Sequence, residues 1–168
     1  VKATLLKTLP NGMYAVQHAS KLDTVNGNLL VQALATSVAQ QFEQKHRFPK
    51  GEVMESKKAR AKLQKACESG LTTLQRNSTV TMHCDGVYEG MDCQVTSSKP
   101  KWEHLSGKLS KQVKEYLVQL STSNEIVDCV LLAGNMHVWL QPIVASVFKD
   151  KMLSSNGSID PSEAIALG

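Results

Sequence analysis

Several patterns that would define a function class are missing from this sequence. No apolar run approaches the roughly 20 residues that a membrane-spanning helix needs, and residues 1–6 have no long apolar stretch of the kind found in secretory signals. The four cysteines form no C-x-x-C pair and the five histidines show no metal-like spacing. No Ser–His–Asp or Cys–His arrangement is supported either. We therefore expect no metal site, no catalytic triad and no membrane contact.

Positive charges outnumber negative ones in this sequence, but the basic residues are scattered along it. The chain has 168 residues, enough for one good core or two small ones, with a net charge of +4 and a pI near 8.9. Its densest basic cluster, residues 57–62, falls on an expected helix, where a solvated helix face is the favoured explanation. A basic α/β nucleic-acid-binding domain remains an alternative, but it depends on net charge alone, so nucleic acid is not favoured as a partner.

The ends of the sequence indicate a fragment, and the cysteines indicate a reducing compartment. The chain begins at Val1 without an initiator Met and stops within an expected helix that starts near Asp160, so we interpret it as a piece of a longer protein. Each cysteine falls in an apolar run, as small buried thiols do. Cys84 and Cys93 lie on consecutive expected strands and could face each other. We favour reduced thiols because the context looks cytosolic, and we expect a cytoplasmic protein.

Local signals predict the first half of the fold. Strands at 3–9 and 13–19 flank Pro10-Asn11-Gly12, in which Asn-Gly is a strong signal for a tight turn. A helix should follow the loop at 23–28 and end near His46. A second long helix should run from the N-cap Ser56 to Gln75. Its apolar side chains share one face, at three- and four-residue spacing: Leu63, Cys67, Leu71 and Leu74.

The second half alternates between strand and helix signals. Two strands should flank a turn at 85–90, and a helix should then run to about Leu120, with Gly107 as a candidate break. The nearly all-apolar run at 126–133 predicts a strand covered on both faces, which is usually central and parallel. A helix follows in which Pro142 is tolerated if it lies in the first turn. The pattern indicates an α/β fold with a helix–helix–hairpin insertion between two pieces of a mixed sheet.

Three places could hold a phosphate or nucleoside. The loop at 24–28 opens a helix, whose N-terminal N–H groups suit anions. The loop at 132–137 follows the apolar strand, and ligands in open α/β sheets bind beyond the carboxyl ends of strands. The third place is the helix face that carries Glu68, Thr72 and Gln75. For the two loops, ordinary turns are the competing explanation.

Six segments in order along the chain resemble the heat shock protein 70 family. The resemblance lies in motifs that look like the family's Gly-Gly loop, F-x-x-K-H, R-x-L-x-x-A-C-E, L-Y-E-G-I-D, V-L-V-G-G-S and I-N-P-D-E-A. They are found here at 26–27, 42–46, 59–68, 87–92, 130–135 and 159–164. This resemblance covers nearly the whole chain. The chain is similar to the second lobe of the family's nucleotide-binding domain.

The resemblance implies an actin-like ATPase, ribonuclease H-like fold. Residues 1–27 and 121–168 would form part of the inner sheet subdomain of the second lobe. Residues 28–120 would form its outer helical and hairpin subdomain.

The departures from the family fall at the nucleotide-contacting positions. The Lys and Arg that sandwich the adenosine correspond to Leu71 and Thr72, and the helix Ser corresponds to Gln75, while Glu68 is retained. Losing the two cations removes stacking and hydrogen-bond donors. Other candidate positions are equally altered or reduced to a single glycine: Asn26 and Gly27 in the first loop, Ala133, Gly134, Asn135 and His137 in the second, and Ser162 in the last motif.

These departures imply a degenerate, regulatory member of the family. The resemblance implies partners of three kinds: a J-domain co-chaperone, a nucleotide-exchange factor or a ribosome-associated complex. The family's catalytic groups lie outside this sequence, so we expect no enzyme activity and no cofactor in this chain, although the longer protein could bind ATP or ADP. The alternative is the nucleotide-binding lobe of a functional ATP-dependent chaperone, with binding weakened but not lost.

Overall fold

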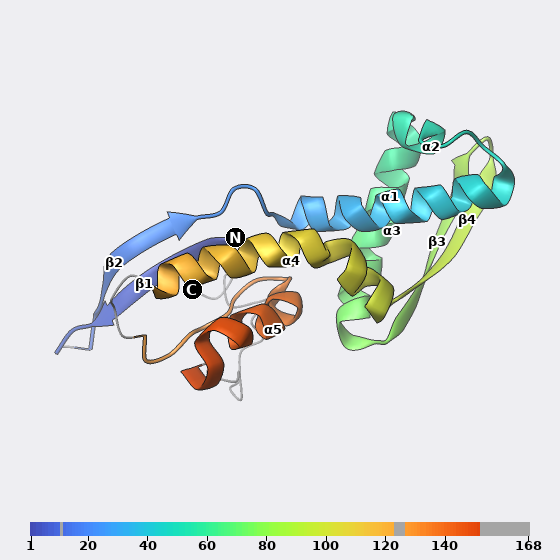
Figure 1. Cartoon of the computed structure of the whole chain (residues 1–168). Helices are drawn as coiled ribbons and strands as arrows, with labels where there is room; N and C mark the ends of the chain where they lie inside the picture. The colour runs from blue at the N-terminus through green and yellow to red at the C-terminus, as the bar shows by residue number, and fades with distance from the viewer. Residues whose placement is uncertain (11, 123–126, 152–168) are drawn as a thin grey trace.

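The computed structural model describes residues 1–10, 12–122 and 127–151. The molecule is elongated (Figure 1), with a β-hairpin at one end and a helix–hairpin unit at the other. Two long helices, α1 (Gly27–His46) and α4 (Lys99–Ser121), connect these ends. In the described part of the chain, no helix has the length and apolar character needed to cross a membrane.

The predicted N-terminal hairpin is confirmed. Strand β1 (Lys2–Thr8) pairs antiparallel with β2 (Tyr14–Lys21), with one register shift between Leu5 and Leu6. Gly12 has φ +77°, a conformation that glycine adopts without steric cost, so the turn signal was correctly interpreted there. Asn11 lies outside the described residues.

The two long helices of the first half are confirmed almost to the residue. Asn26 caps α1, with its Oδ1 accepting from the Leu29 amide at 3.0 Å. Ser56 caps α3 (Lys57–Arg76) through its Oγ, which accepts from the Ala59 amide at 3.4 Å. The predicted apolar stripe of α3 is buried in full and packs against α1 and the second hairpin.

A short helix, α2 (Glu52–Glu55), was not predicted. It is held by Glu43 of α1, which is only 2% exposed and accepts from the amides of Gly51 at 2.9 Å and Val53 at 3.0 Å. A buried carboxylate thus receives backbone hydrogen bonds, which offset the cost of its burial.

The second hairpin is present, but its turn was placed too early. Strand β3 (Thr79–Tyr88) continues past Asp85 through a bulge, because the register with β4 (Met91–Ser98) shifts between Cys84 and Tyr88. The turn is the two residues Glu89 and Gly90, with φ of 49° and 73°. Positive φ at both central residues suits the twist of a hairpin, and the bulge absorbs the polar residues that had suggested an earlier turn.

Helix α4 is continuous, so Gly107 does not break it. Buried Trp102, Ser106, Val113 and Leu117 fix the helix on both sides of the glycine, and packing outweighs its low helix propensity. Helix α5 (His137–Phe148) contains Pro142 in its interior rather than in its first turn. Trp139 of α5 is buried, and its Nε1 donates to the Ser106 Oγ at 3.2 Å.

The predicted buried strand at 126–133 is wrong for the residues that can be described. Residues 127–133 join neither sheet; Val130 forms an isolated bridge, with its amide donating to the Lys151 carbonyl at 2.8 Å. Leu131 is 74% exposed. A strand covered on both faces needs hydrogen-bonded neighbours, and both sheets among the described residues are separate two-stranded hairpins. Ile126, the expected helix start at Asp160 and the candidate Ser162 lie outside the described residues.

Candidate functional site

The first candidate loop is a helix cap in this structure. The Asn26 side chain is occupied by the Leu29 amide, one of the N–H groups that an anion would use. Gly27 is exposed, and a Cβ added to it would meet nothing within 4 Å. The capping role accounts for Asn26, and the space beside Gly27 is open.

The candidate residues of α3 divide between two faces. Leu71 is 2% exposed and belongs to the core with Leu63, Cys67 and Leu74. Glu68 and Thr72 are exposed, and the Thr72 hydroxyl donates to the Glu68 carbonyl at 3.2 Å within the helix. The face that would hold adenosine thus presents one carboxylate, one hydroxyl and the Gln75 amide.

The second candidate loop folds back on itself. Gly134 has φ +109°, and its carbonyl receives the His137 amide at 3.1 Å and lies 3.0 Å from the His137 Nδ1. Glycine is required there by the backbone itself. Ala133 and Asn135 are exposed, and His137 is half-buried at the start of α5.

The structure brings two of the predicted places together. The Gln75 Nε2 donates to the Asn135 carbonyl at 3.1 Å and lies 3.5 Å from the Met136 Sδ, across 60 residues of sequence. Asn26 and Gly27 take no part in this contact. Gln75 thus links α3 directly to the loop at 132–137, at the place where the family resemblance had suggested an adenosine.

Chemically, the joined site is poor in groups that bind phosphate. Its candidate side chains include no Lys or Arg, and His137 is the sole residue among them that can carry positive charge. Across the described ranges 1–10, 12–122 and 127–151, no three His, Cys, Asp or Glu side chains cluster as a metal site requires.

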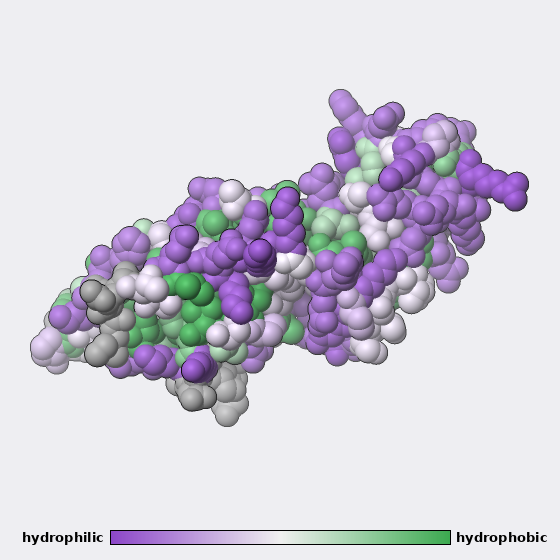
Figure 2. Space-filling model, viewed as in Figure 1, coloured by the Kyte–Doolittle hydropathy of each residue, from purple (hydrophilic) through white to green (hydrophobic). Residues whose placement is uncertain are grey.

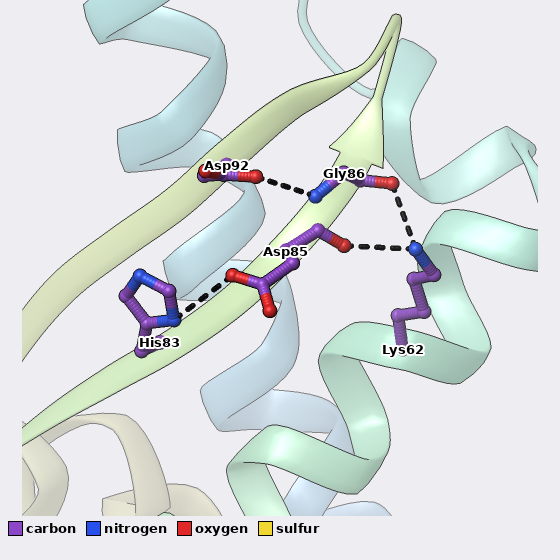
Figure 3. Close-up of polar contacts among 5 residues, drawn as sticks. All are labelled: Lys62, His83, Asp85, Gly86 and Asp92. Atoms are coloured by element: carbon purple, nitrogen blue, oxygen red, sulfur yellow. Dashed lines mark hydrogen bonds and ion pairs between the residues drawn. The ribbon is translucent and has the colours of Figure 1, made fainter.

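A polar cluster at the outer end was not predicted from the sequence. The Lys62 Nζ of α3 donates to the carbonyls of Asp85 at 2.8 Å and Gly86 at 2.9 Å, while the Gly86 amide donates to the Asp92 Oδ1 at 2.7 Å (Figure 3). His83 lies 3.3 Å from the Asp85 carboxylate on the exposed face. The bulge of β3 is thus fixed to α3 by backbone carbonyls, a contact that no side-chain pattern could reveal.

Tyr88 ties the tip of this hairpin to α2. Its hydroxyl donates to the Glu52 Oε1 at 2.9 Å, and this hydrogen bond raises the pKa of Tyr88. The ring also packs edge-on against Phe48, with centroids 5.2 Å apart.

A pocket of about 410 Å³ lies between α1, α2 and α3, and none of the nucleotide candidates within the described residues lines it. Lys50 and Arg60 line it together with polar side chains of α1, and the Glu43 carboxylate at its wall is already satisfied by two amides. This pocket therefore has a partly basic and polar lining, and it shares no residue with the resemblance-based site.

Comparison with known proteins supports the resemblance over almost the whole chain. No family model matches the sequence. Among curated proteins, however, heat shock cognate 70 kDa protein 3 of Dictyostelium discoideum is 25% identical over 97% of this chain and 26% of the relative. A second relative is a ribosome-associated molecular chaperone of Zygosaccharomyces rouxii, 26% identical over 95% of the chain and 26% of the relative. A third, heat shock 70 kDa protein 14 of Xenopus tropicalis, is 26% identical over 94% and 31%.

These relatives confirm the predicted resemblance to the heat shock protein 70 family. They imply an actin-like ATPase fold, with which the small mixed α/β structure is compatible. The names of these relatives are those of heat shock proteins and of a molecular chaperone. The chain spans about a quarter of the length of the Dictyostelium and Zygosaccharomyces relatives.

Proposed function

We propose that this chain is the second lobe of a degenerate heat shock protein 70-like chaperone, in which it serves a regulatory role without catalysing ATP hydrolysis. One observation carries the proposal: Leu71, at the position of the adenosine-clasping Lys, is buried in the core, and Gln75 is bonded to the loop opposite. In this proposal, the internal contact between Gln75 and Asn135 takes the place that an adenosine would occupy, and the two cations that would hold it are missing. Residues 1–27 and 121–168 would be the inner part of the lobe and 28–120 the outer part.

A chimera tests the loss of the purine site. This chain replaces the aligned quarter of the Dictyostelium relative, and ATP binding is measured by calorimetry at submillimolar nucleotide. We expect no measurable binding, because hydrogen-bond donors and cation stacking are both missing. Clear saturable binding would favour the alternative of an ATP-dependent lobe.

A control chimera carries Leu71→Lys, Thr72→Arg and Gln75→Ser together. Its circular dichroism shows whether it folds, which matters because a lysine at position 71 must leave the core. Partial recovery of ATP binding in the folded control would identify these three positions as the cause of the loss.

For the regulatory role, the ribosome is the partner class that the relatives favour. Two of the relatives are named ribosome-associated molecular chaperones. A J-domain co-chaperone or a nucleotide-exchange factor would act in the same cytoplasmic setting and would contact the lobe directly. Co-sedimentation with purified ribosomes tests the proposal in a second chimera, in which this chain replaces the aligned quarter of the Zygosaccharomyces relative, and the unaltered relative is the positive control. Pelleting of the relative without the chimera would exclude this partner.

A further inference from the structure

We propose that Cys84 and Cys93 form an oxidisable dithiol site, which peroxide converts to a cross-strand disulfide inside the outer hairpin. The two residues are direct partners in the register of β3 and β4. Partners across an antiparallel pair have Cα atoms about 4.5 to 5.5 Å apart. Both values fall within the roughly 4.4 to 6.8 Å that a disulfide spans.

The two side chains also point to the same side of the hairpin. Along β3 the inward positions are Val80, Met82 and Cys84, and their partners on β4 are Ser97, Val95 and Cys93. Both cysteines are free thiols here, Cys93 buried and Cys84 half-buried. The bulge starts directly after Cys84, so the backbone on that side is not held in a regular ladder and can adjust as the sulfurs approach.

A third thiol is nearby but is engaged elsewhere. Cys67 of α3 is fully buried, and its Sγ lies 3.7 Å from the Met82 Sδ. Burial raises the pKa of Cys67 to about 12 and that of Cys93 to about 11. Burial also raises the pKa of Cys84, with the Lys62 ammonium opposing that rise and Asp85 and Asp92 adding to it. Cys84, the most accessible of the three, is therefore the attacking group.

The chemistry needs a two-electron oxidant, for which hydrogen peroxide serves. The Cys84 thiolate attacks one peroxide oxygen, the O–O bond breaks, and the departing hydroxide takes up a proton to leave as water. The Cys93 sulfur then attacks the Cys84 sulfenic sulfur. The S–S bond forms, the S–O bond breaks, and the hydroxyl leaves with the Cys93 proton as a second water. In total, two thiols lose two protons and two electrons, and one peroxide becomes two waters.

The test uses the whole chain with Cys129→Ser, because Cys129 is exposed and would react first. The protein is treated with peroxide and then unfolded, the remaining thiols are blocked with N-ethylmaleimide, and the products are cleaved both with trypsin and before aspartates. Cuts before Asp85 and Asp92 separate Cys84 from Cys93, which trypsin alone leaves on one peptide because residues 77–98 contain no Lys or Arg, and the trypsin cut after Arg76 separates Cys67 from Cys84. We expect a linked peptide pair lacking two hydrogens, with Cys67 modified by the reagent on a peptide of its own.

Variants make the assignment specific. Cys67→Ala should give the same linked pair, and Cys84→Ala should give none, leaving Cys93 as a free thiol. In the Cys129→Ser protein, the urea midpoint should rise on oxidation and return after reduction. The linked peptides are detected in the Cys129→Ser protein and in Cys67→Ala. The result is therefore decisive even if Cys84→Ala does not fold. A link involving Cys67, a link between two chains, or sulfinic acid without any link would overturn the proposal. This site does not depend on the proposed function.

Discussion

The two ends of the molecule bury their apolar side chains to very different extents. At the outer end, α1, α3 and the β3–β4 hairpin enclose Leu34, Phe42, Leu63 and Leu74, each at most 1% exposed. At the hairpin end, large apolar side chains remain uncovered: Leu6 at 49%, Met13 at 60%, Tyr14 at 70%, Val16 at 64% and Leu131 at 74%. Figure 2 shows apolar surface gathered towards that end, while the outer end is mainly polar.

This difference in burial indicates which part of the chain supplies most of the free energy of folding. Burial of a large apolar side chain contributes about 1.5 to 3 kcal/mol, and an exposed one contributes little of this. The outer end has a closed core with capped helices, whereas the β1–β2 hairpin has one bulged pair of strands. A two-stranded hairpin alone is marginal in water. We therefore expect stability to be carried by α1, α3 and the β3–β4 hairpin.

The largest difference in the free energy of unfolding should be between Leu63→Ala and Leu131→Ala. Truncating Leu63 removes a fully buried side chain and should lower the free energy of unfolding by about 2 to 5 kcal/mol. Truncating the exposed Leu131 should change it by less than about 0.5 kcal/mol. Urea unfolding followed by circular dichroism measures both. Equal losses would show that the exposed end contributes as much as the outer core.

Alkaline pH should weaken the outer end through its buried thiols. The folded pKa of Cys67 is about 12, above the ordinary 9.0, so the unfolded chain releases this proton first. The stability due to the neutral thiol is complete below about pH 9 and is lost as pH rises towards 12. At pH 10 the loss is about 1.4 kcal/mol for this thiol. Urea unfolding at pH 8 and pH 10 should show a smaller loss in Cys67→Ala, and an unchanged loss would contradict the assignment.

Local signals predicted much of this fold, and nonlocal ones were missed. The Ser56 cap and the Asn-Gly signal each act within a few residues, so α3 and the first hairpin were found. The run at 126–133 was wrongly assigned because its apolar content cannot reveal whether neighbouring strands exist to pair with it.

The candidate site divides in the same way. The spacing of the α3 stripe already indicated that Leu71 belongs to the core. The contact between Gln75 and Asn135 could not be predicted, because it joins a side chain to a backbone carbonyl 60 residues away. Lys62 was missed for the same reason, since its acceptors are carbonyls of a bulge.

Removing the Lys62 contact should loosen the bulge of β3. Lys62→Met keeps the aliphatic length but loses both hydrogen bonds to the carbonyls of Asp85 and Gly86, and it should cost about 1 kcal/mol. Hydrogen exchange at residues 85–88 should accelerate, while exchange in α1 should not change. Lys58→Met, on the exposed surface of the same helix, is the matched control. Equal effects from both variants would show that charge, not these hydrogen bonds, is responsible.

The smallest effect should come from removing the hydrogen bond between Gln75 of α3 and the loop before α5. Gln75→Ala removes the donor to the Asn135 carbonyl, and because this contact is solvent-exposed the cost should be about 0.5 kcal/mol. The clearer readout is local, since amides at 134–137 should exchange faster while those of the core of α3 do not. Gln94→Ala, on the exposed side of β4, controls for loss of a surface amide. If loop exchange is the same in both variants, Gln75 does not hold the loop, and the contact that takes the place of an adenosine in the proposed function loses its support.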